Sequence, residues 1–442
     1  MNAREAAFGV LLKMERDGAY SNLALDGALK SASLSAEDSA LAAAIVYTAT
    51  ERRLTIDYNL SLYLTQPLKK LRPEVLTALR AGCAQIFFMD RIPASAAVNE
   101  SVKLVKRADS AYAAGLVNAV LRKAARNGPR LPKRENGETT FLSVKYSCPE
   151  WLVKMWSEAY GAENAEGIMA ASLEQRASAL RVNTLKTTPQ ELTARLRAEG
   201  VETARYELLP NVLLAESLGA AEKLRAFSEG LFHVQDVASG LCCMALGACP
   251  GETVMDVCAA PGGKSFTIAQ EMRGEGFVKA FDLHANRVGL IESGAARLGI
   301  GNIRAEVRDA ARFDESVEKT DRILCDVPCS GFGVIDKKPE IRYKTPQDID
   351  KLPDLQYLIL CVAAKYLKTG GRLVYSTCTL NPAENEDVCE RFLNEHPDFK
   401  AVPVLKDVPH YGSGQGFVTL MPHVTKSDGF FIAAFTRIGK QQ

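Results

Sequence analysis

A strand, a glycine-rich turn and the start of a helix follow one another in Thr253-Val254-Met255-Asp256-Val257-Cys258-Ala259-Ala260-Pro261-Gly262-Gly263-Lys264. Apolar residues predict the strand at 253–257, and a helix is predicted at 264–273. Gly262 and Gly263 lie between them, so the backbone can approach a ligand without obstruction from a Cβ atom. The stretch is typical of a cofactor-binding turn, although an ordinary tight connection has the same spacing.

Strands and helices alternate from about residue 236 onward, which predicts a doubly wound sheet. Further strands are expected at 278–282, 304–308, 322–326 and 371–376, and helices near 286–298, 354–368 and 384–395. Asp428-Gly429 precedes the apolar run 430–435 and predicts a final antiparallel hairpin.

Carboxylates and thiols stand where these expected strands end. They are Asp256, Asp282, Asp309, Asp326, Cys329 in Asp326-Val327-Pro328-Cys329-Ser330-Gly331, and Cys378 in Val374-Tyr375-Ser376-Thr377-Cys378. Ligands of an open α/β sheet bind beyond the carboxyl ends of the strands, so we expect these side chains at one edge. Two thiols beside a cofactor site indicate covalent catalysis on an electrophilic ring.

The spacing of the turn favours S-adenosylmethionine over a dinucleotide. Asp282 ends the next strand 20 residues after Gly262, which suits a carboxylate that accepts hydrogen bonds from a ribose diol. The pyrophosphate motif Gly-x-Gly-x-x-Gly is absent, and Cys258 occupies the position of the first glycine of a phosphate loop.

These motifs resemble those of the RNA cytosine-5 methyltransferases of the Nol1/Nop2/Sun group. The resemblance rests on Cys258-Ala259-Ala260-Pro261-Gly262-Gly263-Lys264, Asp326-Val327-Pro328-Cys329-Ser330-Gly331 and Thr377-Cys378. Val327 departs from the alanine more usual in the family, without changing a chemical group. The resemblance implies an S-adenosylmethionine site formed by Cys258, Ala259, Ala260, Pro261, Gly262, Gly263, Lys264, Asp282, Arg287, Asp309 and Asp326.

The resemblance also implies a catalytic role for three residues. Cys378 would attack C6 of the cytosine, which makes C5 able to take a methyl group. Cys329 would then remove the C5 proton, and Asp326 would hydrogen-bond the pyrimidine edge. A free thiol has a pKa of roughly 8.5, so the site must lower the pKa of Cys378 or remove its proton during attack. Cys258, Cys325, Cys361 and Cys389 are expected to be core residues.

Three domains are expected in this chain of 442 residues. Residues 1–135 read as helices, and residues 93–100 and 115–122 resemble a NusB-like RNA-binding domain. Residues 136–235 read as a small α+β extension, comparable to an RNA-recognition motif, with strands at 179–183 and 230–235 and a helix at 189–199. Residues 236–442 are expected to form the Rossmann-like methyltransferase domain.

Charge is distributed unevenly along the chain. Residues 1–134 hold 20 Lys and Arg against 12 Asp and Glu, or +8, and the remainder holds 34 against 41, or −7. A net positive charge on the N-terminal region favours binding of a polyanion. A helical surface that only contacts solvent can carry the same excess of basic residues. The RNA candidates are Lys103, Lys106, Arg107, Arg122, Lys123, Arg126, Arg130, Lys337 and Lys338.

Composition argues against several classes of protein. With 47% hydrophobic residues and no long apolar run, the chain is expected to be a cytoplasmic monomer without a membrane span or signal peptide. The 11 cysteines lack Cys-x-x-Cys spacing, which argues against a zinc site or a disulfide scaffold.

The favoured function is methylation of small-subunit (16S) ribosomal RNA at C5 of cytosine. The same chemistry on large-subunit rRNA or tRNA stays open, because the catalytic motifs do not distinguish these substrates. A DNA cytosine methyltransferase is disfavoured by Thr377-Cys378. A non-catalytic assembly or antitermination factor that binds RNA is the alternative from another class.

Overall fold

The computed structural model describes residues 1–17, 24–25, 27–29, 34–108, 110–406 and 416–439. The chain divides into two compact units. The helical unit comprises Met1–Glu174 and Ile335–Lys344, and the sheet unit comprises Gln175–Val334 and Thr345–Gln442. Within the described ranges, no helix has the length and apolar character needed to cross a bilayer.

The helical unit confirms the expectation that the N-terminal region is all-helical. Its core packs α1, α3, α5, α6 and α7 together, with Ala7, Val10 and Ile45 among the buried residues. Gly82 lets two helices approach closely, because a Cβ atom there would meet the Leu121 side chain at 2.6 Å. The elements are α1 (Ala3–Asp17), α3 (Ala36–Glu51), α4 (Arg53–Ser61), η1 (Leu68–Lys70), α5 (Pro73–Phe88), α6 (Ala94–Arg107), η2 (Ala111–Ala113), α7 (Ala114–Asn127), η3 (Arg134–Asn136), α8 (Glu138–Tyr146), α9 (Glu150–Tyr160) and α10 (Ala162–Ala171).

Residues 335–344 belong to the helical unit although they follow the Pro328-Cys329 loop in sequence. They include η5 (Pro339–Tyr343), and Arg342 is fully buried. Its guanidinium donates to the main-chain carbonyls of Glu51 and Tyr146, both at 3.2 Å, and of Ser172 at 3.3 Å. These carbonyls end α3, α8 and α10, where a cation is favourable because the helix dipoles leave partial negative charge.

A small antiparallel sheet opens the sheet unit, as expected for an α+β segment. Its strands follow the order β2-β3-β1-β4, and α11 and α12 cover it with Leu192, Leu196 and Ala226 in the core. The elements are β1 (Ser178–Val182), α11 (Pro189–Ala198), β2 (Thr203–Arg205), β3 (Val212–Ala215), η4 (Ala221–Lys223), α12 (Arg225–Ser228) and β4 (Phe232–Val234). The sequence predicts β1, α11 and β4, but it does not predict β2 or β3.

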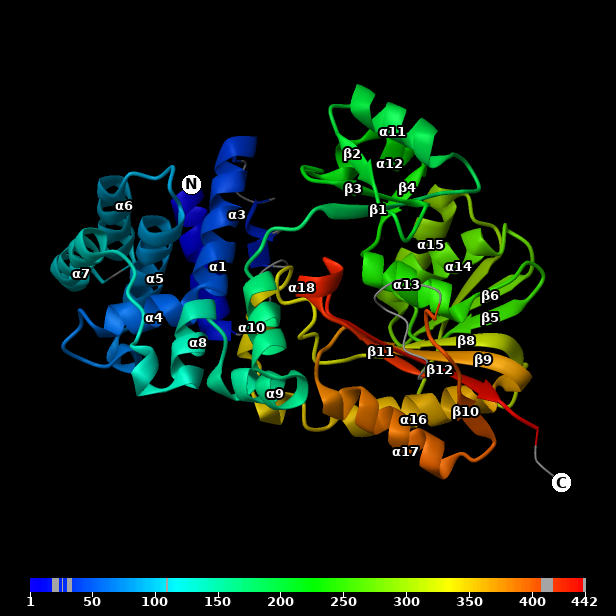
Figure 1. Cartoon of the computed structure of the whole chain (residues 1–442). Coiled ribbons are helices and arrows are strands. Elements are labelled where there is room, and N and C mark those ends of the chain that lie inside the picture. Colours follow the sequence, from blue (N-terminus) through cyan, green and yellow to red (C-terminus); the bar gives the residue numbers. More distant parts are fainter. Residues whose placement is uncertain (18–23, 26, 30–33, 109, 407–415, 440–442) are drawn as a thin grey trace. The chain divides into compact units, whose positions relative to one another are not determined.

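The large sheet follows the order β10-β12-β9-β8-β5-β6-β7, and β11 pairs with β12 (Figure 1). Its central pairs are parallel, and β5 lies between β8 and β6, where the strand order reverses. The expected strands and helices are confirmed within a few residues at each end. The elements are α13 (Val237–Leu246), β5 (Thr253–Asp256), α14 (Gly263–Glu271), β6 (Phe277–Asp282), α15 (Ala285–Leu298), β7 (Ile303–Val307), β8 (Thr320–Asp326), η6 (Pro346–Asp348), α16 (Leu352–Lys365), β9 (Leu367–Thr377), η7 (Pro382–Glu384), α17 (Glu386–Glu395), β10 (Phe399–Ala401), β11 (Phe417–Leu420), α18 (Pro422–Thr425) and β12 (Phe430–Arg437).

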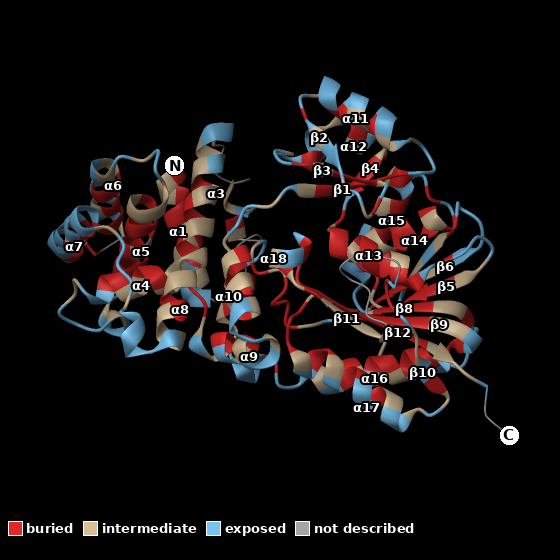
Figure 2. Ribbon diagram, in the orientation of Figure 1, coloured by how far each residue is buried: buried red, intermediate tan, exposed pale blue. Residues whose placement is uncertain are grey.

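Helices cover both faces of this sheet. Figure 1 shows α13, α14 and α15 on one face and α16 and α17 on the other. Neighbouring strand residues serve opposite cores: Val254 packs with the first group of helices and Met255 with the second. The strands β5, β6, β8, β9 and β12 are accordingly buried along most of their length (Figure 2), as expected for strands covered on both faces.

The predicted final hairpin forms an antiparallel pair, but through a longer connection than an Asp-Gly turn. Leu420 of β11 pairs with Phe430 of β12, and α18 lies in the connection between them. β12 also pairs antiparallel with β9, with Phe431 opposite Thr377. The start of β12 therefore lies beside the carboxyl end of β9.

Candidate active site

The glycine-rich turn joins β5 to α14 through a backbone that requires glycine at one position. Gly262 has φ of 111°, and a Cβ atom there would meet the Phe266 ring at 2.3 Å. Ala259, Ala260 and Pro261 precede it, and Gly263 and Lys264 open the helix. The turn thus lies at the carboxyl end of β5, as the sequence indicates, with Pro261 exposed and Ala259, Ala260 and Gly262 buried.

Asp256 is almost completely buried at the end of β5. Its Oδ2 accepts a hydrogen bond of 2.7 Å from Ser265 Oγ. Burial raises the pKa of Asp256 to about 7, and the hydrogen bond from Ser265 opposes this rise only in part.

Asp282 and Arg287 hold the turn from the neighbouring strand and helix. Asp282 ends β6, is 3% exposed, and its Oδ2 accepts from the Ala260 amide at 3.3 Å. Arg287 of α15 lies 3.5 Å from the same carboxylate and donates to the Ala260 carbonyl at 2.9 Å. The structure therefore brings these two predicted residues together on the glycine-rich turn.

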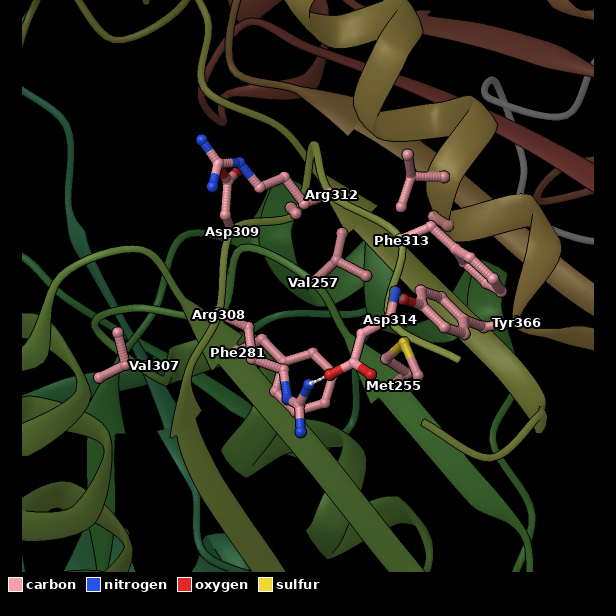
Figure 3. Close-up of a pocket in the computed structure, with 13 residues that line it drawn as sticks. Met255, Val257, Phe281, Val307, Arg308, Asp309, Arg312, Phe313, Asp314 and Tyr366 are labelled. Atoms are coloured by element: carbon pink, nitrogen blue, oxygen red, sulfur yellow. Dashed lines mark hydrogen bonds and ion pairs between the residues drawn. The ribbon is translucent and has the colours of Figure 1, made fainter. Parts of the chain in front are cut away.

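Asp309 lies after β7 and lines a cavity of about 260 Å³ on the α16 side of the sheet. Its carboxylate accepts from the Ala311 amide and pairs with Arg312 at 3.2 Å. Phe313 stacks on Tyr366 in the same wall, with ring centroids 5.0 Å apart (Figure 3). The cavity is too small for a whole nucleoside cofactor, and sequence reasoning did not identify it, because its wall joins residues that lie far apart in the chain.

Lys264 and Asp326 form an ion pair across the point where the strand order reverses. Lys264 Nζ lies 2.7 Å from Asp326 Oδ2, and Ser376 Oγ donates to Asp326 Oδ1 at 2.8 Å. Burial lowers the pKa of Lys264, but attraction to Asp326 outweighs it and raises the pKa overall. Lys264 therefore stays charged, and its ammonium group is paired with the Asp326 carboxylate.

The two predicted thiols meet at this edge. Cys329 Sγ and Cys378 Sγ are 3.2 Å apart, and both cysteines are free. The hydrogen bond between them lowers the pKa of Cys378 and raises the pKa of Cys329. These opposite directions favour thiolate character on Cys378 over Cys329.

The other predicted residues also have clear locations. Cys325 and Cys389 are buried, and Cys258 and Cys361 pack at the edge of the same hydrophobic core, as expected. Exposed basic side chains line α6 and α7 and continue into the following linker; they are Lys103, Lys106, Arg107, Arg122, Lys123, Arg126 and Arg130. Lys337 and Lys338 are exposed within residues 335–344 of the helical unit. The described part of the chain contains no group of three or more His, Cys, Asp or Glu residues that could hold a metal ion.

Comparison with known families matches three parts of the chain. Residues 243–436 match 16S rRNA methyltransferase RsmB/F, residues 1–126 match the NusB family, and residues 148–219 match the ferredoxin-like domain of RsmF/B-like methyltransferases.

Full-length relatives and a solved structure agree with these matches. The chain is 38% identical to the probable ribosomal RNA small subunit methyltransferase B of Bacillus subtilis, over 99% of each chain. It is 35% identical to the protein of the same description in Synechocystis, over 98% of this chain and 99% of that one. The crystal structure of PH0851 superposes with a TM-score of 0.82 at 29% identity, covering 98% of this chain and 99% of that chain.

Proposed function

The chain belongs to the 16S rRNA methyltransferase RsmB/F family, and from this premise we propose that it transfers a methyl group from S-adenosylmethionine to C5 of a specific cytosine in 16S ribosomal RNA. The pair of thiols 3.2 Å apart carries the proposal. Two thiols with opposite pKa shifts suit a reaction that needs a nucleophile first and a base later.

The residues of the cofactor turn fit S-adenosylmethionine. Lys264 is paired with Asp326, so it is not free to bind a phosphate, and this donor carries none. Asp282, Arg287 and Asp309 would hold its nucleoside part, beside the main chain of residues 258–264. When bound, S-adenosylmethionine supplies an electrophilic methyl group on a sulfonium centre.

Cys378 begins the reaction. Its thiolate attacks C6 of the cytosine and forms a C–S bond, which moves electron density to C5 and lets C5 accept the methyl group. Asp326 lies beside the thiols and would hydrogen-bond the pyrimidine edge where the adduct gains a proton at N3.

Cys329 completes the reaction. The hydrogen bond to Cys378 is the largest cause of the raised pKa of Cys329. When Cys378 forms its bond to the ring, that hydrogen bond to the thiolate is lost, and the pKa of Cys329 falls. Cys329 can then lose its proton to water and take the C5 proton as a thiolate base. The electron pair of that C–H bond re-forms the C5=C6 double bond, and the C6–S bond breaks to return Cys378 as a thiolate. The proton that N3 gained is released to water, which restores the neutral aromatic ring.

The domain roles remain part of the proposal. Residues 1–135 would bind RNA phosphates through the exposed basic side chains of α6 and α7, residues 136–235 would extend the RNA-binding surface, and residues 236–442 would carry out the chemistry. Because the substrate is ribosomal RNA, we place this activity in the cytoplasm.

Adduct trapping tests the thiol roles. Cys378→Ala should abolish methylation without any covalent RNA complex, because addition to C6 never starts. Cys329→Ala should permit addition and methyl transfer but block release, so a protein–RNA band should persist on a denaturing gel. That band should be absent from the Cys329→Ala, Cys378→Ala double variant.

Two outcomes would contradict the proposal. If Cys378→Ala forms the trapped complex and Cys329→Ala does not, the thiol roles are reversed. Bisulfite sequencing of rRNA and tRNA from a deletion strain should show loss of one modified cytosine in 16S rRNA. A loss confined to large-subunit rRNA or tRNA would establish one of the alternative substrates.

A further inference from the structure

Two consecutive side chains, Glu384 and Asn385, lie fully buried between the thiol loops. They close the short 3₁₀ turn η7, which follows β9, and α17 begins at Glu386. Asn381 starts this turn by accepting a hydrogen bond from the Ala383 amide. The turn therefore directs both side chains back toward the strand end that carries Cys378.

Glu384 holds both residues that flank Cys329. Its Oε2 accepts from the Ser330 amide at 2.8 Å and from Gln356 Nε2 at 2.9 Å. Gln356 Nε2 also donates to the Pro328 carbonyl at 2.9 Å. The peptide on each side of Cys329 is thus fixed, directly or through one amide group, by a single carboxylate.

Asn385 does the same for Cys378. Its Oδ1 accepts from Thr377 Oγ1 at 2.5 Å, and its Nδ2 donates to the Thr379 carbonyl at 3.0 Å. Thr377 and Thr379 are the two neighbours of Cys378. A hydrogen bond of 2.6 Å between Ser330 Oγ and Thr379 Oγ1 then joins the two loops directly.

Burying the Glu384 carboxylate costs free energy, so its complete burial indicates a role beyond packing. No described Lys, Arg or His forms an ion pair with Glu384. Its second oxygen, Oε1, accepts a hydrogen bond of 2.8 Å from the side-chain amide of Asn381. A carboxylate buried without a cation destabilises the fold unless hydrogen bonds satisfy it. The partners that satisfy Glu384 lead to the Cys329 loop, which points to a role in placing that loop.

We propose that Glu384 and Asn385 are positioning residues that divide the two thiols between them, Glu384 setting the position of Cys329 and Asn385 that of Cys378. The proposal rests on the thiol roles given above. Displacement of a reacting group by about 1 Å can slow a reaction about 100-fold. Loss of Glu384 should therefore slow the step that Cys329 performs, and loss of Asn385 should slow the step that Cys378 performs.

Formation and decay of the RNA adduct separate these two effects. In single-turnover reactions with 16S rRNA and S-adenosylmethionine, Glu384→Ala should release the adduct about 10- to 100-fold more slowly. Adduct formation should slow less, because Cys329 affects that step only through its hydrogen bond to Cys378. Asn385→Ala should form the adduct more slowly by a similar factor, without accumulating it. Glu384→Gln keeps one oxygen for the Ser330 amide and should give an intermediate release rate.

A neighbouring carboxylate provides the control. The Glu386 side chain accepts a hydrogen bond from Thr419, which lies outside both thiol loops. Glu386→Gln should therefore leave the rates of adduct formation and release near those of the wild type. Circular dichroism melting checks that each variant is folded, and Glu384→Gln replaces Glu384→Ala if the alanine variant is not.

The outcomes separate this proposal from the thiol roles on which it rests. If Cys329→Ala fails to trap an adduct, the proposed thiol chemistry is wrong. If Cys329→Ala traps the adduct but the Glu384 and Asn385 variants slow formation and release equally, the two residues only support the fold and the division of roles is overturned.

Discussion

Arg342→Met tests whether one buried guanidinium holds the ends of α3, α8 and α10 together. Methionine has a similar length and retains much of the packing, but it removes every hydrogen-bond donor. The carbonyls of Glu51, Tyr146 and Ser172, at 3.2, 3.2 and 3.3 Å, would lose their partner in a buried site. Two further carbonyls at 3.5 Å are too distant to contribute much.

The size of the effect follows from these contacts. A hydrogen bond to a charged group contributes about 1.5–3 kcal/mol, so three contribute about 4.5–9 kcal/mol. Burial of the guanidinium costs several kcal/mol in the wild type, and the methionine does not incur that cost. We expect a net loss of about 3 kcal/mol. At about 2–4 °C per kcal/mol, Tm should fall by about 6–12 °C.

Thermal unfolding followed by circular dichroism measures this change, and hydrogen exchange locates it. Faster exchange should appear at the ends of α3, α8 and α10 rather than in the large sheet. Arg197→Met is the control, because Arg197 is 65% exposed and pairs only with the exposed Glu202, so Tm should change little. A Tm for Arg342→Met within about 1 °C of the wild type would refute the idea that Arg342 holds these helix ends.

Three further variants test the glycine-rich turn and the basic surface. Asp282→Ala should weaken S-adenosylmethionine binding about 10-fold or more, or about 1.4 kcal/mol; an unchanged Kd by calorimetry would defeat this assignment. Because burial raises the pKa of Asp256 to about 7, its ionisation lowers folded-state stability as pH rises from about 4 to 7. Asp256→Asn should therefore have a higher Tm than the wild type at pH about 8 and a similar Tm at pH about 4; an equal gain at both values would contradict this. Lys103→Gln combined with Lys123→Gln should weaken RNA binding and reduce its salt dependence by about 0.7 in log–log slope per lost phosphate contact, and an unaltered slope in fluorescence anisotropy would remove these residues from the RNA surface.

Sequence reasoning succeeded where the signal is local. The central strands β5 and β6 were predictable because most of their residues are buried and each reads as a largely apolar run that ends in a polar residue, Asp256 or Asp282. It missed β2 and β3, which have three and four residues. Strands this short depend on their neighbours for pairing, and their own residues show no sustained alternation.

The sequence by itself determined which chemical groups stand at the strand ends. A parallel sheet brings the carboxyl ends of its strands to one edge, so the topology alone makes Asp326, Cys329 and Cys378 neighbours. The glycine in the motif also predicted a tight turn between β5 and α14, because a backbone with φ of 111° at Gly262 needs glycine.

Only the tertiary structure decided how those groups act on one another. The pKa shifts of Cys329 and Cys378 depend on an Sγ–Sγ distance of 3.2 Å, and no spacing in the sequence specifies that distance. The sequence around Glu384 and Arg342 does not indicate that they are buried, because charged residues are mostly exposed. Their burial follows from partners 28 to 291 residues away in the chain. Such contacts form only when the whole fold brings distant segments together, so local patterns contain no record of them.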